Sequence, residues 1–428
     1  SFSAMAGVIL VSPRVYAWFD GKWKKPEKGR ARFRTFVIAS FSASLGAVVF
    51  TTPLSALYFG YVSLVSPLTN MLVLWALPFC FIGGFLAVAA GTVFAPLGVG
   101  AAFIVSWLVR YIIFVAKALS ALPFAAVYTA GNLVGWWLAF TYGVFVYAYL
   151  RRGKAPFRPM LPVSVSVIAL SAVIVATTVY YNSSACVTVL DVGQGQSIAV
   201  FGGSDTVLID CGGTGTWEDA GATAADYLLG CGRTRIDVLV LTHFHEDHAG
   251  GVEELLSRMD VAYIAMPDGT DDGDGLRDGI LAAAAENGTE VLSVSADTDM
   301  TVGDISLRLF APLPEGDENE RGMIIIASIG DYDILVTGDV NATVERTLVE
   351  SAALPDFELY VVGHHGSRYS TSYELLDAIN AETAIISVGY NTYGHPTEDV
   401  LWRLSAYGIE ILRTDELGNV TIRIDQDG

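Results

Sequence analysis

The 428 residues are enough for two or three domains, and their net charge of −20 is distributed very unevenly. Residues 1–182 hold only two acidic residues against fourteen basic ones, whereas residues 183–428 hold 43 acidic and 11 basic residues. Apolar runs of membrane-spanning length occur in the first part only, which excludes a single soluble domain. We expect a membrane domain over 1–182 and a soluble domain over 183–428.

The first part contains several apolar segments. Residues 1–19 are apolar from the outset but are interrupted by Pro13 and Arg14. They predict a partial or re-entrant span and no signal peptide, as in a chain that starts part-way through a membrane protein. Residues 54–66 are too short to cross a bilayer. Stretches of spanning length follow at 35–52, 67–90, 98–120, 131–149 and 161–181. The pattern predicts an all-α polytopic bundle with about five to six spans.

Two basic clusters set the expected orientation of these spans. One occupies residues 22–34, and the other consists of Arg151, Arg152, Lys154 and Arg158. Cytoplasmic loops are enriched in Lys and Arg, so both clusters should lie in the cytoplasm. Four crossings between them satisfy this rule if residues 54–66 do not cross. The fifth span then places everything after residue 182 outside, so we expect a multi-pass cell-membrane protein with an extracytoplasmic second domain.

The second part alternates short strands with helices. A dense group of polar residues, Thr242 to Gly251, follows the apolar strand 236–241 and contains three histidines and an aspartate. Three cysteines, Cys186, Cys211 and Cys231, leave a disulfide open without indicating its pairing. The other expected elements before residue 260 are strands at 186–191, 198–201 and 206–210 and helices at 219–229 and 252–258.

The spacing of the four polar residues in this group points to metal binding. His243 and His245 are two positions apart on an extended segment, so their rings point the same way. Asp247 and His248 lie where the chain turns into a helix and can face a second ion. Two ions about 3.5–4 Å apart can clamp both the attacking and the leaving oxygen of a hydrolysis. The H-x-H-x-D-H pattern therefore predicts a dinuclear hydrolytic centre rather than a histidine-containing surface loop.

The remaining candidate ligands also follow predicted strands. Asp339 ends the strand 334–339, and it is a natural bridging carboxylate between two ions. His364 and His365 follow the strand 359–363, and His395 comes after the strand 384–388. Side chains that follow successive strands gather along one edge of a β-sandwich. This repeated placement predicts that all of them converge on the histidine loop.

The motifs of the second part resemble the metallo-β-lactamase fold and, more narrowly, the ComEC family of competence DNA-uptake proteins. The resemblance is carried by H-x-H-x-D-H, by the Gly-Asp pair ending at Asp339 and by several short motifs. These motifs are Asp191–Ser197, Leu208–Gly213, Gly363–Ser367, Gly394–Pro396 and Arg413–Asp415 followed by Gly418. The resemblance implies an α/β sandwich with αββα layers, preceded by the end of a membrane channel domain.

The same resemblance implies a function and roles for particular residues. It would make the chain part of a channel that imports single-stranded DNA, with an outer metal-dependent nuclease that cleaves double-stranded DNA and degrades the other strand. Membrane lipid and other competence DNA-uptake proteins would be its partners. Asp247, His365 and Ser367 would be catalytic, with Ser367 or a histidine contacting phosphate, and Asp210 would support the histidine loop. The implied metal ligands are His243, His245, Asp247, His248, Asp339, His364, His365 and His395.

One departure from the family pattern concerns the metal. Asn319 stands where the fold usually has a histidine, and no histidine lies between His248 and His364. The first-ion side therefore has only His243 and His245 unless His364 or His365 completes it. Two divalent ions are expected, and oxygen-rich ligands favour Mn²⁺ over Zn²⁺.

The charge of the second part leaves alternatives open. Residues 183–428 contain no lysine, so their surface is poorly suited to binding phosphates. Metal ions or a basic partner would then supply positive charge, or the acidity is a solubility adaptation unrelated to substrate. Two other functions fit the sequence: a membrane-tethered hydrolase of small phosphodiesters or lactones, and a transport-only channel with a degenerate outer domain.

Overall fold

The computed structural model divides into two compact units, Ser1–Val167 and Ile168–Gly428, and each is described by itself. The division falls inside one helix, so the domain boundary expected between residues 182 and 183 stays a prediction. The basic residues from 24 to 30 and Lys154 lie outside the described residues. The structure describes residues 2–424 except 24–30, 121, 123–124, 129–131, 154, 156, 159, 184, 217–218, 270–274, 314–315 and 318.

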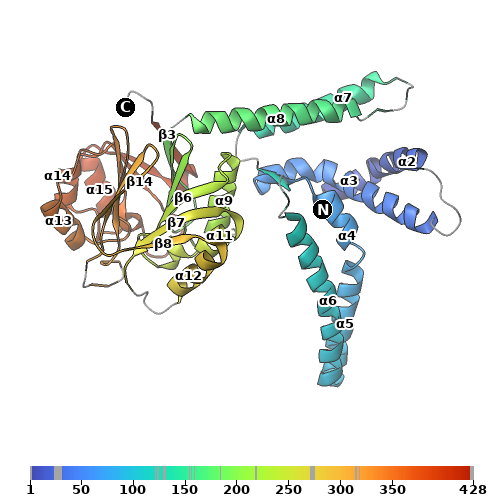
Figure 1. The fold of residues 1–428 in the computed structure, drawn as a ribbon, viewed down its shortest axis with the longest axis horizontal. Helices are drawn as coiled ribbons and strands as arrows, with labels where there is room; N and C mark the ends of the chain where they lie inside the picture. Colours follow the sequence, from blue (N-terminus) through green and yellow to red (C-terminus); the bar gives the residue numbers. More distant parts are fainter. Residues whose placement is uncertain are drawn as a thin grey trace. The chain divides into compact units, whose positions relative to one another are not determined.

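The first unit is helical, as expected from its apolar runs (Figure 1). Its helices are α1 (Phe2–Leu10), α2 (Ser12–Lys22), α3 (Ala31–Tyr58), α4 (Ser66–Val73), α5 (Leu77–Val93), α6 (Ala95–Ser120), α7 (Asn132–Arg151) and the start of α8 (Met160–Asn182). Two short strands, β1 (Tyr61–Ser63) and β2 (Ala126–Tyr128), pair antiparallel. Trp137 of α7 donates a hydrogen bond to the carbonyl of Ser166 in α8, at 2.9 Å.

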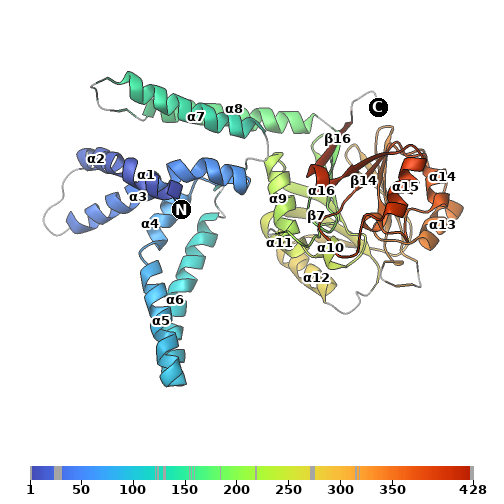
Figure 2. The ribbon, with the colours of Figure 1, turned by 180° about the vertical axis from the view of Figure 1, so that it is seen from behind.

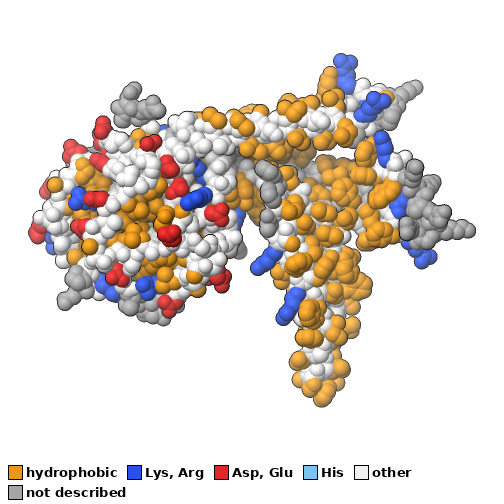
Figure 3. All heavy atoms as spheres, viewed as in Figure 1, with side chains coloured by type: hydrophobic (Ala, Val, Ile, Leu, Met, Phe, Trp, Pro, Cys, Tyr) orange, Lys and Arg blue, Asp and Glu red, His pale blue; other side chains and the backbone are white. Residues whose placement is uncertain are grey.

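Several of these helices have the length and composition of membrane spans. Four helices in the described part of the chain qualify alone, and up to six spans result if each bent pair counts as one. The bent pairs are α1 with α2, at 40°, and α4 with α5, at 46°, so the apolar run 67–90 is broken rather than straight. Residues 54–66 hold the end of α3 and the strand β1. Apolar side chains cover the surface of α5 and α6, whereas carboxylates are scattered over the second unit (Figure 3).

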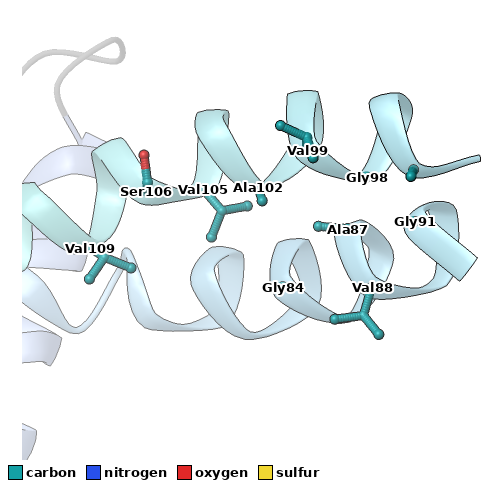
Figure 4. A pocket seen from close by; sticks show the side chains of 11 residues that line it. Gly84, Ala87, Val88, Gly91, Gly98, Val99, Ala102, Val105, Ser106 and Val109 are labelled. Atoms are coloured by element: carbon teal, nitrogen blue, oxygen red, sulfur yellow. The ribbon is translucent and has the colours of Figure 1, made fainter.

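Small residues let α5 and α6 pack closely against each other. Gly98 of α6 lies opposite Gly91 of α5, where a β-carbon on Gly98 would lie 2.4 Å from the α-carbon of Gly91. Ala87 and Ala102 continue this narrow seam between the two helices (Figure 4). Close backbone approach through glycine and alanine is a common way for helices to associate in lipid, where apolar burial gives little driving force.

The second unit is built from two seven-stranded sheets within the described residues, seen from both sides in Figures 1 and 2. The first sheet has the order β16-β3-β4-β5-β6-β7-β8 and the second the order β15-β14-β13-β12-β11-β10-β9. The strands of the first sheet are β3 (Ala185–Val189), β4 (Ile198–Gly202), β5 (Asp205–Ile209), β6 (Arg235–Val240), β7 (Asp260–Pro267), β8 (Glu290–Val294) and β16 (Val420–Ile424). Those of the second are β9 (Thr298–Val302), β10 (Ile305–Phe310), β11 (Ile324–Ile329), β12 (Tyr332–Val336), β13 (Leu359–Val361), β14 (Thr383–Ile386) and β15 (Glu410–Arg413).

Three apolar cores hold these sheets and their helices in four layers. The central core lies between the sheets and includes Val187, Ile198 and Ile325. One outer core joins the first sheet to its helices through residues such as Leu255, and the other joins the second sheet to its helices through Leu375. The helices are α9 (Ala220–Gly230), α10 (Glu246–Ala249), α11 (Val252–Arg258), α12 (Leu276–Asn287), α13 (Ala342–Ser351), α14 (Tyr373–Ile379), α15 (Glu398–Ala406) and α16 (Thr414–Leu417), with a 3₁₀ turn at Gly363–Gly366. The expected αββα sandwich is therefore confirmed.

The sheet topology positions the polar loops. β5 to β8 run parallel in the first sheet, and β12 to β15 run parallel in the second. The carboxyl ends of parallel strands meet at one edge of their sheet, where ligands commonly bind in α/β folds. The candidate residues follow β6, β12, β13 and β14, so both sheets contribute to the site. The cysteines of this unit are free thiols, and so is Cys80.

Candidate metal centre

Two aspartates and two histidines from different loops converge into one compact group. Within the described residues, Asp247, His248, Asp339 and His365 each offer a ligand atom, and these atoms lie within 4.8 Å of one another. His248 Nε2 is 3.0 Å from Asp339 Oδ1, and His365 Nε2 is 3.3 Å from Asp247 Oδ2 and 3.8 Å from Asp339 Oδ1. Two residues follow β6 and two follow β12 and β13, so the group bridges the two sheets.

The histidine loop holds a second, adjoining pair. His243 Nε2 lies 3.1 Å from His245 Nδ1, and the His243 ring is 4.2 Å from that of His248 between centroids. His245 is the residue that precedes the short helix α10, which carries Asp247 and His248. The first half of the H-x-H-x-D-H motif is extended and the second half is helical, so the two pairs of side chains lie next to each other.

The double histidine occupies an unusual backbone conformation. His364 and His365 both have positive φ, 51° and 53°, in the left-handed region that L-residues other than glycine rarely adopt. Hydrogen bonds fix this turn: His364 N donates to Gly338 O at 2.9 Å, and Ser367 N donates to His364 O at 2.8 Å. Such conformations persist where the surroundings determine them, and they cluster at functional sites. This turn directs the buried His365 ring toward Asp247.

Hydrogen bonds from outside the group orient its histidines. His365 Nδ1 lies 2.8 Å from the carbonyl of Ser387, so the ring donates there and Nε2 faces the group. His248 Nδ1 lies 2.7 Å from Asp210 Oδ2 in the same manner. The Asp210 carboxylate also accepts from Thr242 N, at 2.7 Å, and from Gln196 Nε2, at 2.8 Å. Carboxylate or carbonyl partners of this kind fix the tautomer and direction of metal-binding histidines.

The remaining two histidines lie beside the group. His364 Nε2 is 3.5 Å from Asp339 Oδ2, and the His364 ring is 5.6 Å from that of His395. Asn391 shapes the loop before His395, because its Oδ1 accepts from the backbone N–H groups of Tyr393, Gly394 and His395. The structure thus brings all six histidines to one edge of the sandwich.

Charge interactions keep the two carboxylates ionised. Burial raises the pKa of Asp339, but the neighbouring His248 and His365 rings outweigh it and hold this pKa well below the usual range. The pKa of Asp247 is lowered for the same reason, since His365 and His248 outweigh burial. The pKa of His243 is lowered well below its usual value, first by burial and then by the charge of His248. Burial lowers the pKa of His248 and of His365, but the charge of Asp339 helps to outweigh it and both pKa values are raised, so a divalent cation bound here would displace protons from these rings.

The donor set fits a divalent cation. His248 Nε2, His365 Nε2 and Asp339 Oδ1 are buried and face one another, and none of them has a hydrogen-bond partner among the described residues. Leaving buried polar atoms unsatisfied costs free energy, so native proteins nearly always provide partners for them. A cation within reach of these atoms would satisfy all three together. Mixed carboxylate and imidazole ligands suit Zn²⁺ as well as Mn²⁺, so this geometry supports divalent metals without selecting one.

The structure also describes the surroundings of Ser367 and of Asn319. Ser367 is buried, and its Oγ accepts a hydrogen bond of 3.4 Å from Tyr369 N, so a phosphate contact by this hydroxyl stays a prediction. Asn319 lies in the turn before β11, where Gly322 N donates to its carbonyl at 3.0 Å. The side-chain Oδ1 of Asn319 is buried and has no hydrogen-bond partner within the described part of the chain.

The sequence interpretation missed residues that act through hydrogen bonds to the loops. Thr242, Ser387, Glu345 and Asn391 belong to this class. Thr242 stands inside the quoted histidine loop, so its position alone could have drawn attention. Glu345 is far from every motif in sequence, and no local signal distinguishes it from the other acidic residues of a helix.

The fold and this centre define a hydrolase-type domain of the metallo-β-lactamase fold, preceded by a helical unit with the features of a membrane protein. Residues 190–390 match the family model of the metallo-beta-lactamase superfamily, and residues 1–155 match the model described as competence protein. These two matches confirm the resemblance to the ComEC family in both parts of the chain.

Individual relatives agree with the family models. The chain is 29% identical to ComE operon protein 3 of Bacillus subtilis (strain 168), over 56% of this chain and 33% of that protein. It is 32% identical to competence protein ComA of Neisseria gonorrhoeae, over 58% of this chain and 33% of that protein. The chain therefore spans about a third of the length of these relatives. Among solved structures, CmlA, a diiron β-hydroxylase from Streptomyces venezuelae, is 18% identical and matches 56% of this chain and 54% of its own, with a TM-score of 0.41.

Proposed function

We propose that this chain is part of a DNA-uptake channel whose second unit is a metal-dependent phosphodiesterase. The observation that carries the proposal is the group Asp247, His248, Asp339 and His365, in a chain whose first unit matches a competence protein model. The strand that is not imported is the proposed substrate. Other competence DNA-uptake proteins and membrane lipid are the proposed partners, and the domain boundary is proposed at residues 182 and 183.

The residues of the group have distinct tasks. Asp247 and Asp339 provide the negative charge that holds the cations, while His248 and His365 provide nitrogen ligands from the two sheets. His243 and His245, with His364 and His395 beside Asp339, complete the proposed ligand set. Divalent cations held in this way supply Lewis acidity for phosphodiester hydrolysis. Asp210 and the Ser387 carbonyl keep the rings aimed at the cations, and Ser367 is the proposed contact for the substrate phosphate.

We also propose an outer location for the second unit, and the helices of the first unit support it. Between the two basic clusters lie α3, the bent pair of α4 and α5, α6 and α7, which make four crossings when the pair counts once. The three-residue strand β1 is far too short for another crossing. With the basic clusters in the cytoplasm, α8 would be the fifth crossing and would place the second unit outside.

Cleavage assays on the full chain test the proposal. Purified protein in lipid nanodiscs is incubated with labelled duplex DNA and either Mn²⁺ or Zn²⁺. We expect cleavage that is lost in Asp247→Asn and His245→Ala but retained in Asp299→Asn, which changes an exposed carboxylate on β9. Unchanged cleavage in Asp247→Asn would reject the assignment of the site. Turnover of a small phosphodiester or lactone without cleavage of DNA would instead indicate the membrane-tethered hydrolase, and a chain that binds no metal would indicate transport alone.

A further inference from the structure

The second unit has very few cations that could meet a phosphate. It contains no lysine, and its eleven arginines are surrounded by 43 acidic residues. Ten of these arginines are engaged by carboxylates, backbone carbonyls or aromatic rings. The side chain of Arg368 alone has no such partner among the residues that the structure describes. An exposed cation without a partner in a strongly acidic domain requires an explanation.

Arg368 lies directly beside the metal centre. It follows Ser367 in the loop after the 3₁₀ turn that carries His364 and His365, and its side chain is exposed. It is the third residue after His365, and the hydrogen bond from Ser367 N to His364 O ties the start of this loop to the turn. Arg368 is therefore close enough to the centre for its guanidinium to contact a phosphate next to the one that reacts.

Hydrogen bonds with Arg403 and Glu345 fix the loop that carries Arg368. The Arg403 guanidinium donates to the carbonyls of Arg368, Ser370 and Thr371, at 3.1, 3.0 and 2.5 Å. The buried Glu345 carboxylate accepts from Thr371 N at 2.6 Å, and from Ser372 N at 2.7 Å. A rigid loop loses little entropy when it binds a ligand, so these contacts prepare Arg368 for binding.

Exposed aromatic rings accompany this cation. Tyr369, the next residue, has 70% of its surface exposed, and Tyr393 has 75% exposed. The Tyr393 ring lies 5.9 Å from that of His395, with an interplanar angle of 33°. Aromatic rings next to a cation are the usual contacts for single-stranded nucleic acid, because unpaired bases expose their faces for stacking.

We propose that Arg368 binds a backbone phosphate of single-stranded DNA and that Tyr369 stacks on an unpaired base of the same strand, beside the metal centre. The inference rests on the proposed function for the identity of its substrate. Stacking contributes affinity that does not depend on positive charge, so a domain with this acidic surface can still hold DNA. A duplex hides its base faces, and the site therefore selects frayed or separated strands over paired ones.

Binding measurements without catalysis test the inference. The full chain in nanodiscs, with the Asp247→Asn substitution to prevent cleavage, is titrated against fluorescent oligothymidine at several salt concentrations. We expect Arg368→Ala to weaken binding about tenfold and to reduce the slope of log Kd against log salt by about 0.7. Arg368→Lys should keep that slope, since it keeps the charge. Tyr369→Leu should weaken binding several-fold, whereas Tyr369→Phe should retain it and an abasic oligonucleotide should bind weakly to every variant.

The control is Arg308→Ala, which removes another exposed arginine, on β10, paired with Asp299. Basic residues of the first unit contribute equally to all variants. Wild-type affinity in Arg368→Ala, or an equal loss in Arg308→Ala, would overturn the inference. A chain that binds DNA through Arg368 but never cleaves it would remove the proposed nuclease and leave this inference standing. Cleavage of DNA together with unaltered binding in Arg368→Ala would support the proposed nuclease and overturn this inference.

Discussion

Asp210 and His248 form a buried pair in which the carboxylate Oδ2 lies 2.7 Å from Nδ1 of the ring. Because Nδ1 is engaged, the opposite nitrogen of His248 is left facing Asp339. Asp210 itself has a positive φ of 57°, a conformation that aspartate and asparagine tolerate better than other side chains. One residue in an unusual backbone state thus sets the direction of a ring in the metal centre.

Substitution of Asp210 by Asn should weaken metal binding without unfolding the protein. Asparagine accepts the same backbone conformation but is a weaker partner for His248 Nδ1. Loss of an outer hydrogen-bond partner typically lowers metal affinity by about 10- to 100-fold. Titration calorimetry of the full chain with Mn²⁺ and Zn²⁺ measures this effect, with Asp299→Asn as the control. An affinity within about twofold of wild type would show that Asp210 does not hold the ring for metal binding.

Gly212 allows the histidine loop to pack against the turn after β5. A β-carbon at this position would lie 2.3 Å from the backbone nitrogen of His248 and 2.5 Å from the carbonyl carbon of Asp247. We expect Gly212→Ala to reduce the free energy of unfolding by about 1–3 kcal/mol through overpacking and to weaken metal binding. Gly269→Ala is the matched control, because no described atom lies within 4 Å of its added β-carbon. Equal melting temperatures for the two variants would contradict the packing argument.

The pH dependence of stability should reveal the buried Glu345. Burial raises the pKa of this carboxyl above its usual 4.5, despite the hydrogen bonds and the Arg403 charge that lower it. Its contribution to stability is fully present below the unfolded-state pKa and is lost as pH rises through the folded-state pKa. Glutamine does not titrate, so the melting temperature of wild type minus that of Glu345→Gln should fall from pH 4.5 upward. Thermal scans of both proteins across this range measure it, and a difference that grows with pH would refute the prediction.

The seam between α5 and α6 should tolerate no large side chain. Gly98→Leu places a branched group where even a β-carbon meets the Gly91 backbone, so we expect a loss of about 1–3 kcal/mol in stability. Gly100→Leu, on the same helix with open space around its added β-carbon, should have little effect. Thermal unfolding in detergent compares the two. If Gly100→Leu is as harmful as Gly98→Leu, the close packing of these helices is not the cause.

Periodicity and local motifs were sufficient to predict most of the second unit. The strand before His243 and the helix after Gly251 are local patterns, and the structure places β6 and α11 within a residue of the expected bounds. The placement of every candidate ligand after a strand also allowed their convergence to be predicted. What joins the strands into sheets is a set of distant pairings, such as β16 with β3, that no local pattern encodes.

The convergence of the candidate residues was predictable but their grouping was not, and their roles stay predictions. From the sequence, His243 and His245 were assigned to one ion and the Asp247–His248 pair to a second. In the structure, Asp247 and His248 group with Asp339 and His365. The part played by His365 depends on two consecutive left-handed residues, which histidine seldom adopts and which propensity therefore does not predict. The Glu345 and Arg403 contacts to the loop arise from burial, a property of the complete fold.

The division of the candidate centre between two sheets determines when it can assemble during synthesis. The ligands of the first sheet all precede residue 250, whereas those of the second follow Val336, and β16, at residues 420–424, closes the first sheet against β3. A chain synthesised only as far as residue 330 would contain the candidate ligands of the first sheet but not those of the second. The edge of the first sheet at β3 would still lack its partner β16. The candidate centre can therefore assemble only after the strands of both sheets have been synthesised.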